Sequence, residues 1–473
     1  MGEARLAKNY ALLSIGESLS KVFNFLSFTF LSRELGAAVY GDLEFSLAAT
    51  LVFALFVQMG LGSYGAREIA RQPKRAQELL SEIMAVRMWM SLISLAALIA
   101  FAAFVNKPAE VKLLILAYGV SLLLVPGLAL WFFQGHDHMQ WVAAAHLVRH
   151  GAFAACVFGF YRGGNPLWWI GAFEVGSVTV CVLFGYWIVT RRMGYRPVVP
   201  KMSLSLAWVH LRQAVPIGLS NMTWALLWLS PLVVLGMQVN DASLGWFAAS
   251  HRITMALHTF VWWYFFNLLP AISRTAAGRP QELQGLMDRS MSIVCWGSIF
   301  VAVIGTLVAD QALGLAFGKE FFDGGVQLAL LVWCIPIAAI SGHYRYMLIG
   351  YDLQHWLLLW TAIGATIAVT ATYVLAPVYG ATAGAGALIF GNVICLALCY
   401  LTARRRIQPI SFWRRLATPT AGAIAVAALV LTPLAANQFL MAVAGVGLYA
   451  SVFAWAQRRD LPVWWRALSA RLT

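Results

Sequence analysis

The chain has 473 residues, of which 61% are hydrophobic and only 11% are charged. Soluble domains carry about 25% charged residues, so this composition excludes an ordinary water-soluble protein. Apolar runs of about 20 residues fit spanning helices, whereas barrel strands would need about ten alternating residues. The sequence therefore predicts an all-α polytopic membrane protein. The net charge of +14 is interpreted as basic cytoplasmic loops, with no nucleic acid as a partner, because no basic tail carries interleaved aromatic residues.

Fourteen apolar runs are long enough to cross a bilayer. They cover residues 11–31, 41–60, 83–104, 112–133, 141–161, 168–190, 214–237, 245–270, 290–308, 326–349, 356–376, 379–402, 418–435 and 438–456. If the N-terminus is cytoplasmic, the inside segments hold 23 Lys and Arg residues and the outside segments hold 5. The positive-inside rule therefore predicts that both termini are cytoplasmic. Arg87, near the beginning of the third run, is interpreted as a cytoplasmic anchor.

Two segments of the chain repeat a pattern six spans apart. WFFQGHDHMQW after the fourth run and YMLIGYDLQHW after the tenth run align Gly135, Asp137 and Trp141 with Gly350, Asp352 and Trp356. A weaker echo aligns Gly41 with Gly245. Six helices per repeat predict two parallel six-helix lobes, residues 1–195 and 196–410, of the kind that enclose a central cavity in many transporters. The last two helices and a cytoplasmic tail, residues 411–473, are appended to them.

Polar residues form a stripe on the first predicted span. Glu17, Lys21 and Asn24 recur at spacings of three and four residues, which places them on one face of a helix. A charge near the middle of a bilayer costs roughly 2.5–3.5 kcal/mol and usually faces a cavity or a partner. Glu17 and Lys21 can pair with each other, so the stripe either lines a cavity or joins two helices.

Other predicted spans also carry ionisable residues. Arginine matches phosphate oxygens with two parallel hydrogen bonds, so a surplus of buried cations suits an anionic substrate. The acidic residues could pair with a buried arginine or serve as a proton or cation site. The predicted binding residues are Lys21, Asn24, Arg149, His251, Arg252, His258 and Arg345, and the predicted coupling residues are Glu17, Glu44 and Glu174.

The sequence lacks the motifs of several other functions. There is no Gly-rich GKS or GKT loop for ATP, no HExxH motif and no GxSxG motif, so neither catalytic residues nor metal ligands are expected. The six cysteines lie inside apolar runs without metal-ligand spacing and are interpreted as small core residues. No cofactor is predicted beyond a coupling H⁺ or Na⁺.

Several motifs resemble the polysaccharide-transporter flippases. The segment from residue 31 to 71 reads LSRELGAAVYGDLEFSLAATLVFALFVQMGLGSYGAREIAR and is similar to the entry of that family. WFFQGHDHMQW looks like the segment after the family's fourth helix. LGWFAASHRITMAL looks like its eighth helix, in which Arg252 occupies the place of the usual arginine, and LAFGKEFFDGGVQLALLVW looks like the segment before its tenth helix.

The resemblance implies a Wzx-type flippase of the multidrug/oligosaccharidyl-lipid/polysaccharide (MOP) superfamily. Such proteins form two lobes in a V around a cavity. They move an undecaprenyl-diphosphate-linked oligosaccharide, such as an O-antigen or capsule repeat unit, to the periplasmic leaflet of the bacterial inner membrane by alternating access. The resemblance also implies a polysaccharide polymerase and other assembly proteins as partners. A monomer is expected, because each chain would contain its own cavity.

Four alternatives remain open at this point. A drug/cation antiporter of the same superfamily would favour twelve spans and an acidic cavity. A lipid II flippase would share the architecture. A membrane-embedded glycosyltransferase or polymerase would need a large polar loop, and no predicted loop exceeds about 30 residues. A scaffold without transport activity would be separated from a flippase only by a transport assay.

Overall fold

The computed structural model describes residues 3–197, 200, 203–239, 241–276, 280–407, 412–432 and 437–458. Within these ranges all regular structure is helical. Helices suit a membrane because they satisfy their own backbone hydrogen bonds where no water is present. The chain divides into two compact units, residues 1–248 and 249–473. The predicted cytoplasmic tail beyond residue 458 lies outside the described residues.

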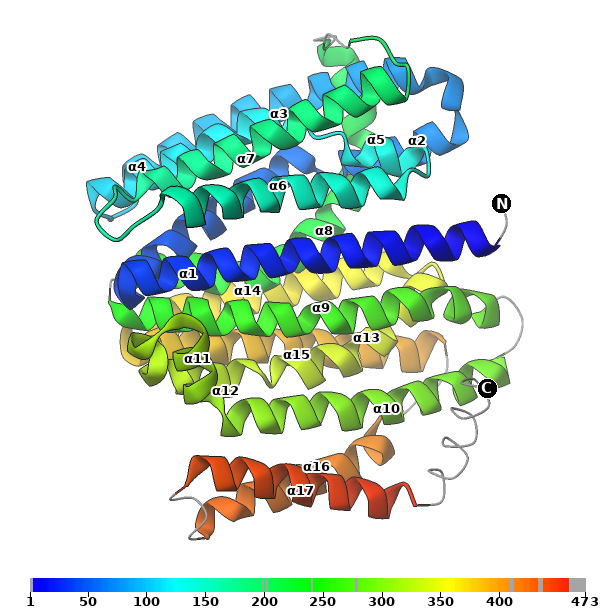
Figure 1. Cartoon of the computed structure of the whole chain (residues 1–473). Coiled ribbons are helices and arrows are strands. Elements are labelled where there is room, and N and C mark those ends of the chain that lie inside the picture. Colours follow the sequence, from blue (N-terminus) through cyan, green and yellow to red (C-terminus); the bar gives the residue numbers. More distant parts are fainter. Residues whose placement is uncertain are drawn as a thin grey trace. The chain divides into compact units, whose positions relative to one another are not determined.

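The first unit is built from long helices and short connecting turns (Figure 1). Its elements are α1 (Glu3–Gln58), α2 (Leu61–Arg71), η1 (Pro73–Arg75), α3 (Ala76–Phe104), α4 (Ala109–Val120), η2 (Ser121–Gly127), α5 (Leu130–Gly135), α6 (Met139–Phe160), α7 (Trp168–Trp187), η3 (Ile188–Arg192) and α8 (Leu204–Gln238). The first residues of α9 (Ala242–Ala276) also belong to this unit.

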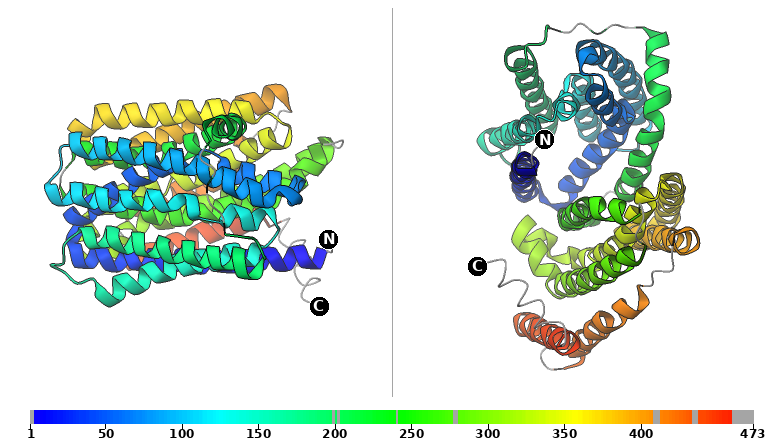
Figure 2. Two further views of the ribbon diagram at one scale, coloured as in Figure 1. Left: turned by 90° about the horizontal axis from the view of Figure 1, so that it is seen from above. Right: turned by 90° about the vertical axis from the view of Figure 1, so that its right-hand side faces the viewer.

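The second unit continues from α9 and is helical in the same way. It contains α10 (Pro280–Leu307), α11 (Ala309–Phe317), η4 (Lys319–Gly324), α12 (Gly325–Leu331), α13 (Cys334–Gly350), α14 (Gln354–Tyr379), α15 (Ala381–Arg406), α16 (Trp413–Ala428), η5 (Leu429–Leu431) and α17 (Gln438–Ala456). The last two helices, orange and red in Figure 2, lie side by side.

Counting one kink, twelve of the fourteen predicted spans are helices long and apolar enough to cross a membrane. Eleven helical segments of the described chain are long and apolar enough to cross a membrane. The first of them merges two predicted runs, because α1 continues through Gly36 with φ 72° and ψ 169°. This backbone region is open essentially to glycine alone, so Gly36 sets the bend that separates the first two spans. Helices α16 and α17 supply the thirteenth and fourteenth runs.

The sequence repeat corresponds to one turn built twice. Asp137 after α5 and Asp352 after α13 both have a left-handed backbone, with φ of 58° and 57°. In each copy the next amide donates to a carbonyl five residues earlier, from His138 to Phe133 at 2.9 Å and from Leu353 to Leu348 at 2.7 Å. This is the bonding of a Schellman helix end. The repeat therefore marks a shared helix stop.

Helix α8 is packed firmly into the first unit. It contacts α1, α2 and α3. The side chain of Lys107 has no exposed surface, and its Nζ donates to Asp42 Oδ1 at 2.7 Å and to the Val239 carbonyl at 3.4 Å. Lys107 thus connects α1, the end of α3 and the end of α8.

Candidate functional site

Lys21 is the exposed charge in the middle of the first span. Its side chain is exposed, whereas Glu17 and Asn24 on the same stripe of α1 are half-buried. Glu17 lies within electrostatic range of the Lys21 ammonium, as the spacing of four residues predicts. An ammonium group that is exposed at this depth needs water or an anion beside it, because hydrocarbon would not solvate it.

Helix α6 places more ionisable groups beside this stripe. Helices α1 and α6 pack closely, with Phe28 and Phe153 stacked at a centroid distance of 5.8 Å. His146 on α6 lies within electrostatic range of both Lys21 and Arg149. The stripe and the polar face of α6 therefore meet.

An ion pair joins this region to α7. Arg149 donates from Nη2 to Glu174 Oε1 at 2.5 Å, and the two side chains are 30% and 16% exposed. His150 lies within electrostatic range of both partners. We call the set Glu17, Lys21, His146, Arg149, His150 and Glu174 the α1–α6–α7 charge cluster.

The net charge of the cluster depends on the protonation of its histidines. Two cations face two carboxylates, so the cluster is neutral while both histidines are neutral. The surplus of cations expected from the sequence is thus reduced here by the pairing of Arg149 with Glu174.

Glu44 lies apart from this set, farther along α1. Its carboxylate is buried, and Oε1 accepts a hydrogen bond from the Tyr40 hydroxyl at 2.6 Å. The two residues are four apart, so this bond forms within one helix.

The predicted residues of the second unit lie on α9 and α13. His251 and His258 are buried on α9, together with Thr254 between them, and Arg252 is half-buried. Arg345 on α13 is half-buried and lies within electrostatic range of the Cys395 and Cys399 thiols on α15.

Arg87 differs from its expected role as an anchor at a helix start. Helix α3 begins eleven residues earlier, at Ala76, so Arg87 lies well inside it and is 5% exposed. Its Nη1 donates to the Leu128 carbonyl at 3.4 Å, and its guanidinium lies 5.6 Å from the ring centroid of Trp131. The polar residues from 76 to 82 obscured this start, because they lower the apolar signal.

The sequence analysis missed two buried polar networks. In the first unit His210 Nδ1 is 3.1 Å from the Tyr64 hydroxyl, and its Nε2 is 2.9 Å from Glu82 Oε2. In the second unit Ser290 Oγ is 2.7 Å from the Tyr264 hydroxyl and 2.8 Å from His343 Nε2. These residues lie 26 to 146 positions apart along the chain, so no local pattern could reveal them.

His136 also has a structural partner. Its Nε2 is 2.7 Å from the Tyr195 hydroxyl, beyond the end of α7. His136 Nδ1 donates to the Phe132 carbonyl at 2.9 Å, so the Nε2 of the neutral imidazole accepts this bond from the Tyr195 hydroxyl. The bond ties the turn after α5 to the segment after α7.

Two sequence comparisons relate the chain to known proteins. A family model described as "Polysaccharide biosynthesis protein" matches residues 6–276. A protein of Escherichia coli (strain K12) described as "Putative O-antigen transporter" is 23% identical over 351 residues, which cover 72% of this chain and 82% of that protein.

Solved structures match the fold over most of its length. The lipid II flippase MurJ in an inward closed conformation matches with a TM-score of 0.73 and 12% identity, over 95% of this chain and all of that one. An inward-facing multidrug resistance MATE family transporter matches with a TM-score of 0.65 and 17% identity, over 84% of this chain and 98% of that one. The fold is therefore that of MOP superfamily transporters, and the chain belongs to the polysaccharide biosynthesis protein family.

Proposed function

We propose that this protein is a flippase for a lipid-linked oligosaccharide. Its cargo is an undecaprenyl-diphosphate-linked repeat unit of an O-antigen or capsule, which it moves from the cytoplasmic to the periplasmic leaflet of the bacterial inner membrane. The family match, the Escherichia coli relative and the transporter fold support this proposal.

The observation that carries the proposal is the exposed Lys21 within a membrane span. A lysine at this depth in lipid costs roughly 2.5–3.5 kcal/mol, which an aqueous cavity or a bound anion offsets. Arg149 and two histidines extend the same cluster. A diphosphate group with its attached sugars has the charge and the hydrogen-bonding capacity to fit this surface.

Transport in this proposal needs no covalent step. Arg252 and Arg345 of the second unit bind the same headgroup in the course of alternating access, with Asn24, His251 and His258 as further contacts. A coupling proton or sodium ion binds at Glu17, Glu44 or Glu174, of which Glu17 belongs to the exposed stripe. The protein acts as a monomer beside a polymerase and other assembly proteins.

The test is a complementation panel. The gene is expressed in bacterial strains that each lack one lipid-linked-sugar flippase, and surface polysaccharide is measured. Restoration of O-antigen or capsule is the expected result and names the glycan class. Restoration only of a lipid II flippase mutant, or only of drug resistance, would contradict the proposed cargo.

Two variants connect the panel to the site. Cells that carry Lys21→Ala should have at least tenfold less surface polysaccharide, while the amount of the protein in the membrane stays unchanged. Lys319→Ala is the matched control, because Lys319 is an exposed lysine of η4 that has no place in the proposed cavity. Full activity of Lys21→Ala would remove the cluster from the binding site.

A further inference from the structure

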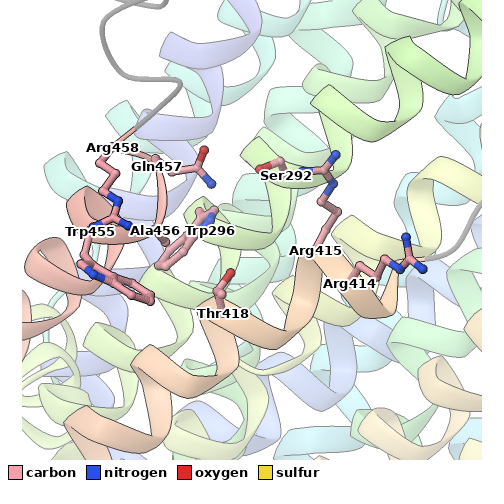
Figure 3. Close-up of a pocket in the computed structure, with 9 residues that line it drawn as sticks. All are labelled: Ser292, Trp296, Arg414, Arg415, Thr418, Trp455, Ala456, Gln457 and Arg458. Carbon is pink, nitrogen blue, oxygen red and sulfur yellow. The ribbon is translucent and has the colours of Figure 1, made fainter.

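The second unit contains a basic pocket of its own. A pocket of about 340 Å³ opens among α10, α16 and the end of α17 (Figure 3). The residues that define it here are Ser292, Trp296, Arg415, Trp455, Gln457 and Arg458, and we call this set the α10–α16–α17 pocket.

The pocket has a positive charge that nearby carboxylates scarcely neutralise. Among the described residues the pocket arginines have one recorded carboxylate neighbour, Asp288, whose Oδ2 is 4.0 Å from Arg415 Nη2. Both side chains are more than a third exposed, so this pair is weak. Arg458 lies over the Trp455 ring with its Cζ 5.6 Å from the ring centroid, a contact that orients its guanidinium. Figure 3 shows Arg415 and Arg458 on opposite sides of the pocket.

Two buried polar side chains face the same space. Ser292 is 7% exposed and Gln457 is 9% exposed. Neither side chain has a recorded hydrogen-bond partner within the described part of the chain. Figure 3 shows the Gln457 amide directed between the two arginines. Their polar atoms are open to the pocket, so both side chains are available to hydrogen-bond a polar ligand there.

The pocket lies where a lipid headgroup would be. Arg415 is at the beginning of α16, and Gln457 and Arg458 follow the end of α17, so these three lining residues lie at helix ends. The positive-inside rule places these ends on the cytoplasmic side. Trp455 is exposed and supplies an aromatic ring of the kind that favours the headgroup layer, whereas Trp296 is buried at the base of the pocket wall.

From these observations we infer that the α10–α16–α17 pocket binds the phosphate headgroup of a lipid in the cytoplasmic leaflet. Arg415 and Arg458 hold the phosphate oxygens from two sides, because the guanidinium fork matches phosphate geometry. The Gln457 amide and the Ser292 hydroxyl donate to the remaining oxygens. The Trp455 ring covers the apolar part of the lipid that adjoins the phosphate.

Two lipids share this chemistry, and the experiment separates them. Cardiolipin carries two phosphates, and undecaprenyl diphosphate carries a diphosphate on a carrier chain. The purified full-length protein is titrated in detergent with each lipid, with phosphatidylcholine as the zwitterionic reference, and the shift of its melting temperature gives an apparent Kd. We expect a clear upward shift with at least one of the anionic lipids and none with phosphatidylcholine.

Variants assign the binding to the pocket. Arg415→Gln combined with Arg458→Gln should raise the apparent Kd for the anionic lipid by at least tenfold. Arg405→Gln, at the exposed end of α15, is the matched control and should bind as the unaltered protein does. Gln457→Leu keeps both arginines and should still weaken binding, which keeps the test valid if the double variant folds poorly.

Each outcome bears on the inference. A response to cardiolipin alone identifies a membrane phospholipid site, and a response to undecaprenyl diphosphate identifies a docking place for the carrier. The inference would be overturned if the double variant and Gln457→Leu both bind the lipid as tightly as the unaltered protein. It would also be overturned if Arg405→Gln loses as much affinity as the double variant. The result does not depend on which sugar the protein carries, so failure of the complementation panel leaves it standing.

Discussion

At the scale of single residues, Lys107 makes a clear contribution to stability. Its ammonium is fully buried and is held by Asp42 and the Val239 carbonyl. Lys107→Met would leave the Asp42 carboxylate without its cation, and such a loss costs about 3–5 kcal/mol when both groups are buried. Asp42 is 23% exposed, so water offsets part of the loss and we expect the lower end of this range. The melting temperature of the purified protein measures the effect.

A double variant separates the charge from the packing. Lys107→Met with Asp42→Asn removes both charges and should recover part of the lost stability. If Lys107→Met alone melts at the unaltered temperature, the buried ion pair contributes nothing to stability.

The Arg149–Glu174 pair allows structure and transport to be separated. Arg149→Gln and Glu174→Gln should each lower the melting temperature, because each leaves a partly buried charge unpaired. The double variant should regain stability but remain at least tenfold reduced in transport, because Arg149 also belongs to the proposed headgroup site. Membrane level and surface polysaccharide are measured on the same cells. Recovery of transport would give the pair a structural role alone.

At the scale of elements, the repeated turn predicts matched substitutions. Asp137 and Asp352 both adopt a left-handed backbone, which costs a residue other than glycine roughly 1–2 kcal/mol. Asp137→Gly and Asp352→Gly should each stabilise the protein by about 0.5–1 kcal/mol, because relief of this strain exceeds the extra entropy that glycine loses on folding. Asp137→Gly should raise the stability more than Asp352→Gly, because the Asp137 Oδ2 is buried and has no hydrogen-bond partner among the described residues.

Activity distinguishes this turn from a catalytic site. Both glycine variants should retain full surface polysaccharide in the complementation assay. Loss of activity in Asp137→Gly alone, with normal melting, would show that the first copy does more than end a helix.

The elements show what the sequence can and cannot predict. Hydropathy located the spans, because lipid solvates a spanning helix only when most of its side chains are apolar. It placed the start of α3 seven residues late, since Gln77, Glu78, Ser81 and Glu82 lower the apolar signal of the first turns. The stripe on α1 followed from helical periodicity, whereas the Arg149–Glu174 bond and the Tyr64–His210–Glu82 network depend on which helices pack together. The repeated pattern at Asp137 and Asp352 could be found in the sequence because the turn that it marks has only local bonds.

At the scale of the whole molecule, the topology can be tested by cysteine labelling. The six native cysteines are unpaired, and five of them are buried, so Cys156→Ala gives a background of low reactivity. In that background Gln72→Cys, in the exposed turn after α2, should label only after the cells are permeabilised. Asn437→Cys, just before α17, should label from outside. The opposite pattern would invert the predicted orientation.

The position of α8 has a consequence for biosynthesis. The ribosome makes Lys107 long before it makes Val239, and yet the two are bonded in the finished protein. Glu82 likewise meets His210 only after α8 has emerged. A nascent chain that stops after the sixth predicted span therefore has Lys107 bonded to Asp42 without the Val239 carbonyl, and Glu82 without His210. The contacts of the first unit are therefore completed only when translation has passed the middle of the chain.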